Sequence, residues 1–263
     1  MCSAAARVIK TLSTGNVPVV GVTSVDDELF VLLDRDSDQV AVFSINDYRL
    51  LRHFNLYGLE RGSDNLTSCV RHRCLYMSDY HNRRVHRYDL ASSAMSKWSV
   101  PGPPYGLSVT PSCNLLVTCS EPNKLVELSA DSGQCVREIA LQSDIKDPWH
   151  AVQMTTGQYV VCHGIPNDSL NRVCIVDDDG KVTRKLCYVG QLNWPRHLAV
   201  DENLQLICVA DRGNDRVVVL SPTLQFVRYI SEGLSLLCRL YIHQATRRLY
   251  VSQANRDVVV IQF

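Results

Sequence analysis

The chain repeats itself six times, and this repetition limits its possible folds more than any other feature of its 263 residues. Each repeat holds a short apolar run, a polar turn and a second apolar run. The first apolar residue after each turn recurs at intervals of 45, 40, 48, 44 and 41 residues, at Val40, Val85, Leu125, Val173, Val217 and Val258. Six such repeats account for the whole chain. We therefore predict one domain, residues 1–263.

A period in the forties with several short strands per repeat is typical of β-propeller blades. Helical repeats of similar length would need amphipathic segments of about ten or more residues, and none is visible. In the fifth repeat we expect four strands, at residues 197–200, 204–210, 216–220 and 226–230, separated by polar turns. The sequence predicts an all-β, six-bladed propeller of four-stranded blades whose first strands line a central channel.

The last repeat is incomplete, because it stops at VVVIQF and so lacks a fourth strand. A strand-like segment at residues 6–13 precedes the first blade. We predict that it is the outer strand of the last blade, beside residues 258–263, so that two exposed sheet edges pair with each other. Blades bury their faces against their neighbours, and a partial ring should therefore be unstable.

Composition excludes several functional classes. Apolar residues make up 46% of the chain and 27 Lys and Arg balance 27 Asp and Glu, so disorder and a global basic field are excluded. We see no signal-peptide core in MCSAAARVIK and no stretch long enough to span a bilayer. The eleven cysteines lie mostly in apolar runs without a CxxC pair, which favours buried, reduced thiols. We expect a cytoplasmic, monomeric domain.

Two repeats share a polar signature in which Asn follows Asp by three residues, Arg by five and Val by six. The segments are MSDYHNRRV and ADRGNDRVV, and WPRHLAVDENL precedes the second. This pattern resembles the NHL repeat over essentially the whole chain. The third, fourth and sixth repeats depart from it, with Ser120, His163 and Gln253 where Asp is expected. The resemblance implies a six-bladed propeller similar to the C-terminal NHL domain of tripartite-motif proteins, with a substrate- or RNA-binding role.

In the family that the chain resembles, ubiquitin-ligase activity belongs to a separate RING domain. The close Cys and His pairs of a RING are missing from this sequence, and no serine–histidine–aspartate pattern is recognisable. We therefore expect a non-enzymatic recognition module of the ubiquitin pathway, without a cofactor.

The repeated acids Asp79 and Asp211 are expected to form turns, since Asp and Asn accept backbone hydrogen bonds there and Arg can pair with Asp. Residues beside these turns that do not repeat are better candidates for binding. They are Arg35, Tyr80, His81, Arg83, Lys124, Arg172, Arg212 and Arg256.

A second group of candidates lies in the segments that lead into the first strands, PPYG, DPWH, NWPRH and LCRL. We expect these segments to share one face of the disc with the turns between the second and third strands. They place near the channel mouth Tyr105, Trp149, His150, Trp194, Arg196, His197 and Arg239. Aromatic residues and Arg on loops are typical anchors of a binding surface. The two tryptophans have an alternative role as wedges between blades.

The sequence leaves the partner open. Ten basic residues fall on the proposed face, which favours RNA, but acids are interleaved with them, and we lean towards a protein partner. A metal site is the third alternative, because His150 and His197 occupy matching positions and the NHL resemblance extends to a peptidyl-hydroxyglycine lyase with a zinc-holding propeller channel. Aligning the other first strands puts Thr67, Gly106 and Arg239 at that position, so we expect no metal.

Overall fold

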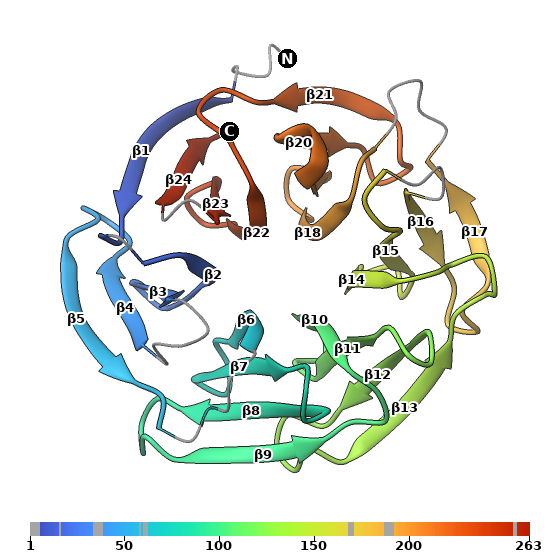
Figure 1. The fold of residues 1–263 in the computed structure, drawn as a ribbon, viewed down its shortest axis with the longest axis horizontal. Helices are drawn as coiled ribbons and strands as arrows, with labels where there is room; N and C mark the ends of the chain where they lie inside the picture. Colours follow the sequence, from blue (N-terminus) through green and yellow to red (C-terminus); the bar gives the residue numbers. More distant parts are fainter. Residues whose placement is uncertain are drawn as a thin grey trace.

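The computed structural model describes residues 6–15, 17–33, 39–57, 59, 63–167, 171–186, 192–254 and 257–263. Within these ranges, twenty-four strands form six antiparallel sheets of four strands, arranged in a ring around a central channel (Figure 1). The predicted six-bladed, all-β propeller is confirmed. The one helical element in the described ranges is the short 3-10 turn η1 (Arg212–Asn214), and no helix there has the length and apolar character to cross a membrane.

Each blade contributes one strand to each of four concentric positions (Figure 1). The channel strands are β2 (Val19–Val25), β6 (Ser63–Cys69), β10 (Pro104–Val109), β14 (Pro148–Gln153), β18 (Pro195–Asp201) and β22 (Leu237–His243). The second strands are β3 (Glu28–Leu33), β7 (Cys74–Asp79), β11 (Leu115–Cys119), β15 (Tyr159–His163), β19 (Leu206–Asp211) and β23 (Arg248–Gln253). The third strands are β4 (Gln39–Ser44), β8 (Arg84–Asp89), β12 (Lys124–Leu128), β16 (Arg172–Val176), β20 (Arg216–Leu220) and β24 (Asp257–Gln262). The outer strands are β5 (Leu50–Asn55), β9 (Met95–Ser99), β13 (Cys135–Ala140), β17 (Val182–Lys185), β21 (Phe226–Ile230) and, in the last blade, β1 (Arg7–Ser13). Blades are numbered 1 to 6 from the sheet that begins with β2.

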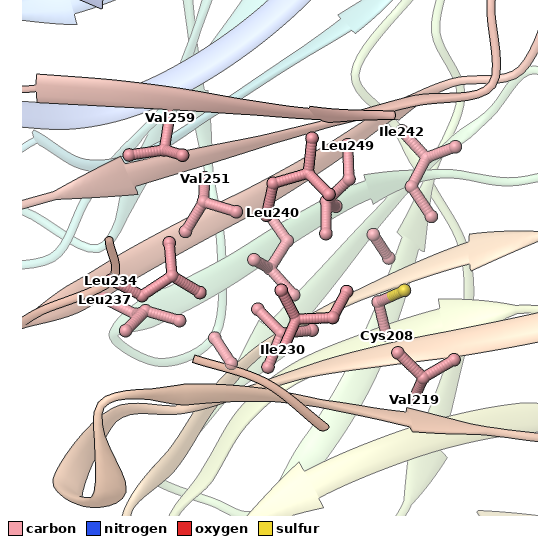
Figure 2. Close-up of a cluster of buried hydrophobic side chains, with 14 residues drawn as sticks. Cys208, Val219, Ile230, Leu234, Leu237, Leu240, Ile242, Leu249, Val251 and Val259 are labelled. Atoms are coloured by element: carbon pink, nitrogen blue, oxygen red, sulfur yellow. The ribbon is translucent and has the colours of Figure 1, made fainter. Parts of the chain in front are cut away.

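Neighbouring blades bury their middle strands against each other. Every residue of β7, β11 and β15 is buried, because a blade covers each face of these strands. Figure 2 shows the contact between blades 5 and 6, where Cys208 and Val219 face Leu240 and Leu249. Outer strands such as β13 are largely exposed. The core is therefore a ring of six interfaces rather than one central cluster, as a propeller requires.

The predicted closure is confirmed. β1 pairs antiparallel with β24, from Arg7 opposite Gln262 to Ser13 opposite Asp257, with an irregularity between Val8 and Lys10. The first and last segments of the chain thus lie in one sheet with β23 and β22. Closure leaves no unpaired edge on β24 and completes the interface with blade 1.

The repeated acids have the predicted role in turns. Asp79 is buried and accepts hydrogen bonds from the backbone N–H and side-chain amide of Asn82, at 3.1 and 3.0 Å. Asp211 is also buried and pairs with Arg216 of its own blade, 2.7 Å from Nε to Oδ2. In blade 2, His86 Nε2 also lies 3.1 Å from Asp79 Oδ2.

The described thiols agree with the prediction of reduced cysteines. Nine cysteines fall in the described ranges; all nine are free and six are buried. Burial raises the pKa of Cys119, Cys174 and Cys208 to about 12. These thiols behave as small apolar core residues. Cys2 and Cys187 lie outside the described residues.

Candidate functional site

Four aromatic rings from four consecutive blades touch in series on one face of the disc. Tyr80 and Tyr105 have ring centroids 4.8 Å apart, Tyr105 and Trp149 4.4 Å, and Trp149 and Trp194 6.0 Å. All four rings are half-buried, so each packs on the protein and still presents surface to solvent. The separations are those of directly contacting aromatic pairs.

Two arginines lie on this row of rings. The guanidinium of Arg196 lies 4.8 Å from the ring centroid of Trp149 and 4.9 Å from that of Trp194. That of Arg212 lies 5.0 Å from the Trp194 ring. Each distance is within the range of a cation–π contact. We call the four rings and two guanidiniums the aromatic–arginine arc.

A backbone irregularity repeated between blades aims the arc residues at the face. In blades 3, 4 and 5 the pairing of the first with the second strand shifts just after a proline, between Pro104 and Gly106, Pro148 and His150, and Pro195 and His197. The extra residue in each shift is Tyr105, Trp149 or Arg196. A bulge leaves its extra residue unpaired and re-aims its side chain. The same local device therefore delivers three arc residues.

Trp194 differs from its neighbours in two ways. Its backbone lies in the left-handed region, at a φ of 55°, which is costly for a bulky residue. Its indole Nε1 is buried and has no hydrogen-bond partner among the described residues, whereas Trp149 Nε1 donates to the carbonyl oxygen of Gly164 at 2.6 Å. Trp149 also packs against the core between blades 4 and 5. The expected wedge role thus applies to Trp149, which contributes to the arc as well.

Arg212 ties the end of the arc to blade 6. Its Nη1 donates to the carbonyl oxygen of Leu237 at 3.0 Å and lies 3.0 Å from the thiol of Cys238. Cys238 occupies the shifted position of blade 6, between Leu237 and Arg239, where the other blades place arc residues. This thiol was not among the residues expected in the site. Its alignment with Tyr105 and Trp149 was the signal available.

One residue further along the first strands, the side chains turn into the channel wall. His150 and His197 are 2% and 6% exposed, and their rings stack with centroids 3.7 Å apart. Gly106 makes this possible, because a Cβ there would lie 2.7 Å from the Cα of His150. Arg239, which was expected on the face, is also buried. The structure therefore places these three candidates beneath the arc rather than in it.

Backbone hydrogen bonds hold both imidazoles. The N–H of Leu198 donates to His150 Nδ1 at 3.3 Å, so that Nε2 carries the ring proton and donates to Leu107 O at 3.0 Å. The N–H of Leu240 likewise donates to His197 Nδ1 at 3.3 Å. Burial is the main cause that lowers the pKa of His150 to about 3, and it holds the pKa of His197 well below its usual value. Both rings are neutral near pH 7.

The channel below the histidines holds a cavity of about 210 Å³. Part of its polar lining is bonded internally, as in the 2.7 Å contact between the hydroxyls of Thr23 and Ser68 and the 2.8 Å bond from Ser108 to Ala151 O, whereas Nε2 of His197 has no hydrogen-bond partner among the described residues. Within the described residues, no three His, Cys, Asp or Glu side chains gather closely enough to hold a metal ion.

The predicted alignment of Thr67, in blade 2, with His150 is wrong. Ser63 pairs with Asp79 and Leu66 with Met77, so the shift in this blade spans Asp64 and Asn65. The residue at the level of His150 is therefore Asn65 and not Thr67. The wider irregularity at this blade is the reason that simple counting from the turn failed.

The remaining candidates are not part of the arc, although His81 contacts one of its rings. Arg83 is exposed and His81 contacts Tyr80 edge-on at 5.2 Å, whereas Lys124 is engaged with Glu138 at 2.6 Å on the blade 3 sheet. Arg172 is exposed at the start of β16. Arg35 and Arg256 lie outside the described residues.

Comparison with known proteins shows the fold but no family. No family model matches the chain, and no curated protein sequence does. Among solved structures, selenomethionine-substituted virginiamycin B lyase from Staphylococcus aureus has a TM-score of 0.70 at 9% identity, covering 98% of this chain and 100% of that one. A catalytically inactive variant of that lyase with quinupristin gives 0.68 at 11%, covering 98% and 99%. The WD40 propeller domain of Doa1 gives 0.70 at 12%, covering 99% and 98%. At these identities only the β-propeller fold is shared, and a shared fold does not by itself assign a function.

Proposed function

We propose that this propeller is a non-catalytic module that recognises a macromolecule through the aromatic–arginine arc. The observation that supports this most is the series of ring contacts, 4.4 to 6.0 Å long, from Tyr80 to Trp194, with Arg196 and Arg212 laid on the indoles. Tyr, Trp and Arg dominate the energetics of protein interfaces. A rigid ring of blades holds them in place at little cost in conformational entropy.

A protein partner is the first candidate, in the manner of the substrate-binding propeller of tripartite-motif NHL proteins. The polar signature of blades 2 and 5, with Asp79 and Asp211 buried in their turns, supports that kinship. A cytoplasmic location is part of the proposal, and reduced thiols such as Cys162 and Cys208 suit it. Ubiquitin transfer itself would require a separate RING domain.

RNA is the second candidate, because aromatic rings and guanidiniums are also what single-stranded RNA stacks on. The arc offers both groups side by side at Trp149, Arg196 and Trp194. RNA affinity would fall steeply with added salt, whereas a protein interface built on aromatic contacts would be much less sensitive.

We do not favour the third hypothesis, a metal-dependent enzyme of the lyase type. His150 spends both ring nitrogens on backbone groups, and Arg239 contributes positive charge that lowers the pKa of both histidines. A cation bound there would be repelled by the same charge. Metal analysis of the purified chain tests this choice: about one zinc per molecule, lost in the double variant His150→Ala and His197→Ala, would restore the enzyme hypothesis.

Site-specific crosslinking tests the proposed function. A photoreactive residue is placed at Tyr80 in the arc or, as the matched control, at Tyr229, an aromatic residue that is 37% exposed on the outer strand β21. We expect a discrete adduct, identified by mass spectrometry, from the first position only, and its loss when Trp149→Ala is added. Equal adducts from both positions, or none from Tyr80, would contradict recognition through the arc.

A further inference from the structure

The arc has no slots between its rings. A planar base inserted between two rings needs them roughly 7 Å apart, two van der Waals contacts of about 3.5 Å. The observed separations are 4.8, 4.4 and 6.0 Å, and the gap between the two indoles already contains the Arg196 guanidinium. The arc is therefore a continuous apolar strip. A ligand must lie along it rather than thread through it.

The dimensions of the strip suit an extended peptide. Three steps of 4.8, 4.4 and 6.0 Å give a span of at most about 15 Å, which a polyproline II chain covers in about five residues at ~3.1 Å each. Successive ring planes also rotate, by 32°, 46° and 67°. Facets that turn along the strip match a threefold helix better than the parallel faces of stacked bases. Aromatic-lined surfaces are a known mode of recognising such chains.

The two ends of the strip differ in charge. The tyrosine end, Tyr80 and Tyr105, adjoins Pro103 and Pro104. The tryptophan end carries Arg196 and Arg212 together with the indole N–H of Trp194, a buried donor for which the described part of the chain supplies no acceptor. A complementary ligand is apolar at one end and accepts hydrogen bonds at the other.

The charge of Arg212 favours an anionic group as the hydrogen-bond acceptor of the ligand. Its recorded hydrogen bonds all go to uncharged groups, the carbonyl oxygens of Leu236 and Leu237 and the thiol of Cys238. The nearby carboxylate of Asp215 accepts instead from the backbone N–H of Leu236 at 2.5 Å. No carboxylate among the described residues pairs with Arg212. A guanidinium in this situation binds a carboxylate favourably, because both partners gain charge-assisted hydrogen bonds.

We propose that the arc binds an extended, proline-containing peptide segment that carries a carboxylate, with the prolines on the tyrosine end and the carboxylate at Arg212. This inference rests on the proposed function of the arc and names the partner. Proline supplies a preformed helix that loses little entropy on binding. The carboxylate sets the direction of the peptide along the strip.

Fluorescence anisotropy with the whole chain tests the assignment. The probes are fluorescein-labelled peptides of five prolines followed by three aspartates, or by three asparagines as the uncharged match, and a labelled uridine dodecamer. We expect the aspartate peptide to bind about tenfold more tightly than the asparagine peptide. Trp149→Ala should weaken both peptides by about tenfold or more. Thermal unfolding of each variant confirms that it is folded.

Arg212 provides the decisive variant. Arg212→Gln should reduce the preference for aspartate over asparagine to less than about threefold, and Arg212→Lys should restore part of the preference. Equal binding of the two peptides by the unaltered chain would overturn the assignment. So would tighter binding of the uridine dodecamer than of either peptide, which would favour RNA. Arc-dependent crosslinking without peptide binding would overturn this assignment alone and leave the proposed function standing.

Discussion

Two layers of the same strands, one residue apart, have opposite environments. Trp149 and Arg196 lie on the face, half-buried and stacked on each other, whereas His150 and His197, which follow them directly, are buried in the channel wall. The bulge after each proline separates the layers, because it turns one side chain out of the sheet before regular pairing resumes. The arc should therefore govern binding, and the histidine layer should govern stability.

Lowering the pH should have the largest effect on stability, and this effect should come from the histidine layer. The pKa of His150 is about 3 in the folded chain and about 6.5 when unfolded, and that of His197 is also lowered, so the unfolded state takes up more protons below pH 6.5. Stability contributed by the neutral rings is complete above pH 6.5 and is lost as pH falls. We expect a loss of roughly 2 kcal/mol from His150 between pH 6.5 and 5, and a further loss in the same direction from His197, measured by urea unfolding.

The matched control for acid is the double variant His150→Gln and His197→Gln. Its unfolding free energy should depend much less on pH in the same window, although His163, whose pKa burial lowers to about 4, keeps a residual slope. An unchanged slope would place the acid sensitivity elsewhere and break the assignment of stability to the histidine layer.

The second-largest effect is expected at the glycine that admits the imidazole. In Gly106→Val, the new Cβ would lie 2.5 Å from the backbone oxygen of Trp149 and 2.7 Å from the Cα of His150. Backbone atoms cannot move aside cheaply, and we expect a loss of about 3 kcal/mol in unfolding free energy. Gly157→Ala, which meets no atom within 4 Å but has a φ of 87°, should cost only about 1 kcal/mol. Similar losses in the two variants would refute a steric cause.

A smaller effect distinguishes the two tryptophans of the arc. Trp194→Gly relieves a left-handed backbone at a φ of 55°, whereas Trp149→Gly removes a hydrogen bond to Gly164 and core contacts without such relief. We expect the Trp149 variant to lose about 1 kcal/mol more in thermal or urea unfolding. Equal losses would show that the backbone of Trp194 is not strained.

The smallest effect on stability is expected at the open end of the arc. Tyr80→Ala removes ring contacts to Tyr105 and His81 but little buried surface, and the unfolding free energy should fall by less than about 1 kcal/mol. Crosslinking and peptide binding should still weaken measurably. A loss as large as that of Gly106→Val would erase the distinction between the two layers.

Sequence periodicity predicted the blades and their closure because each repeat must bury its faces on its neighbours, which fixes a constant strand order. Strand bounds in the fifth repeat differed by two residues at Leu206, where the polar turn runs on through Gln205 at a φ of 53°. The predicted alignment of Thr67 with His150 was wrong because a bulge adds residues to the strand and the sequence gives no sign of it.

All six arc residues were among the candidates proposed from the sequence, but so were residues that are not in the arc, and the burial of each candidate was not predicted. Prolines before Tyr105 and Trp149 identified the face, and the ring contacts follow from four blades sharing one geometry. The sequence alignment placed Arg239 at the level of His197, one position past Arg196, but it did not show that this level is buried in the wall while Arg196 lies on the face. Side-chain burial at a bulge depends on the neighbouring blade, which is about 40 residues away in sequence.

Because β1 pairs with β24, the ring can close only at the end of synthesis of the chain. β1 is made before the other described strands, yet the strand it pairs with, β24, spans Asp257–Gln262. At about 5 to 20 residues per second, some 10 to 50 s pass before that partner leaves the ribosome. Throughout this time the nascent ring is open, with the apolar face of blade 1 exposed. Its yield in cells should therefore depend on chaperones that hold such intermediates apart.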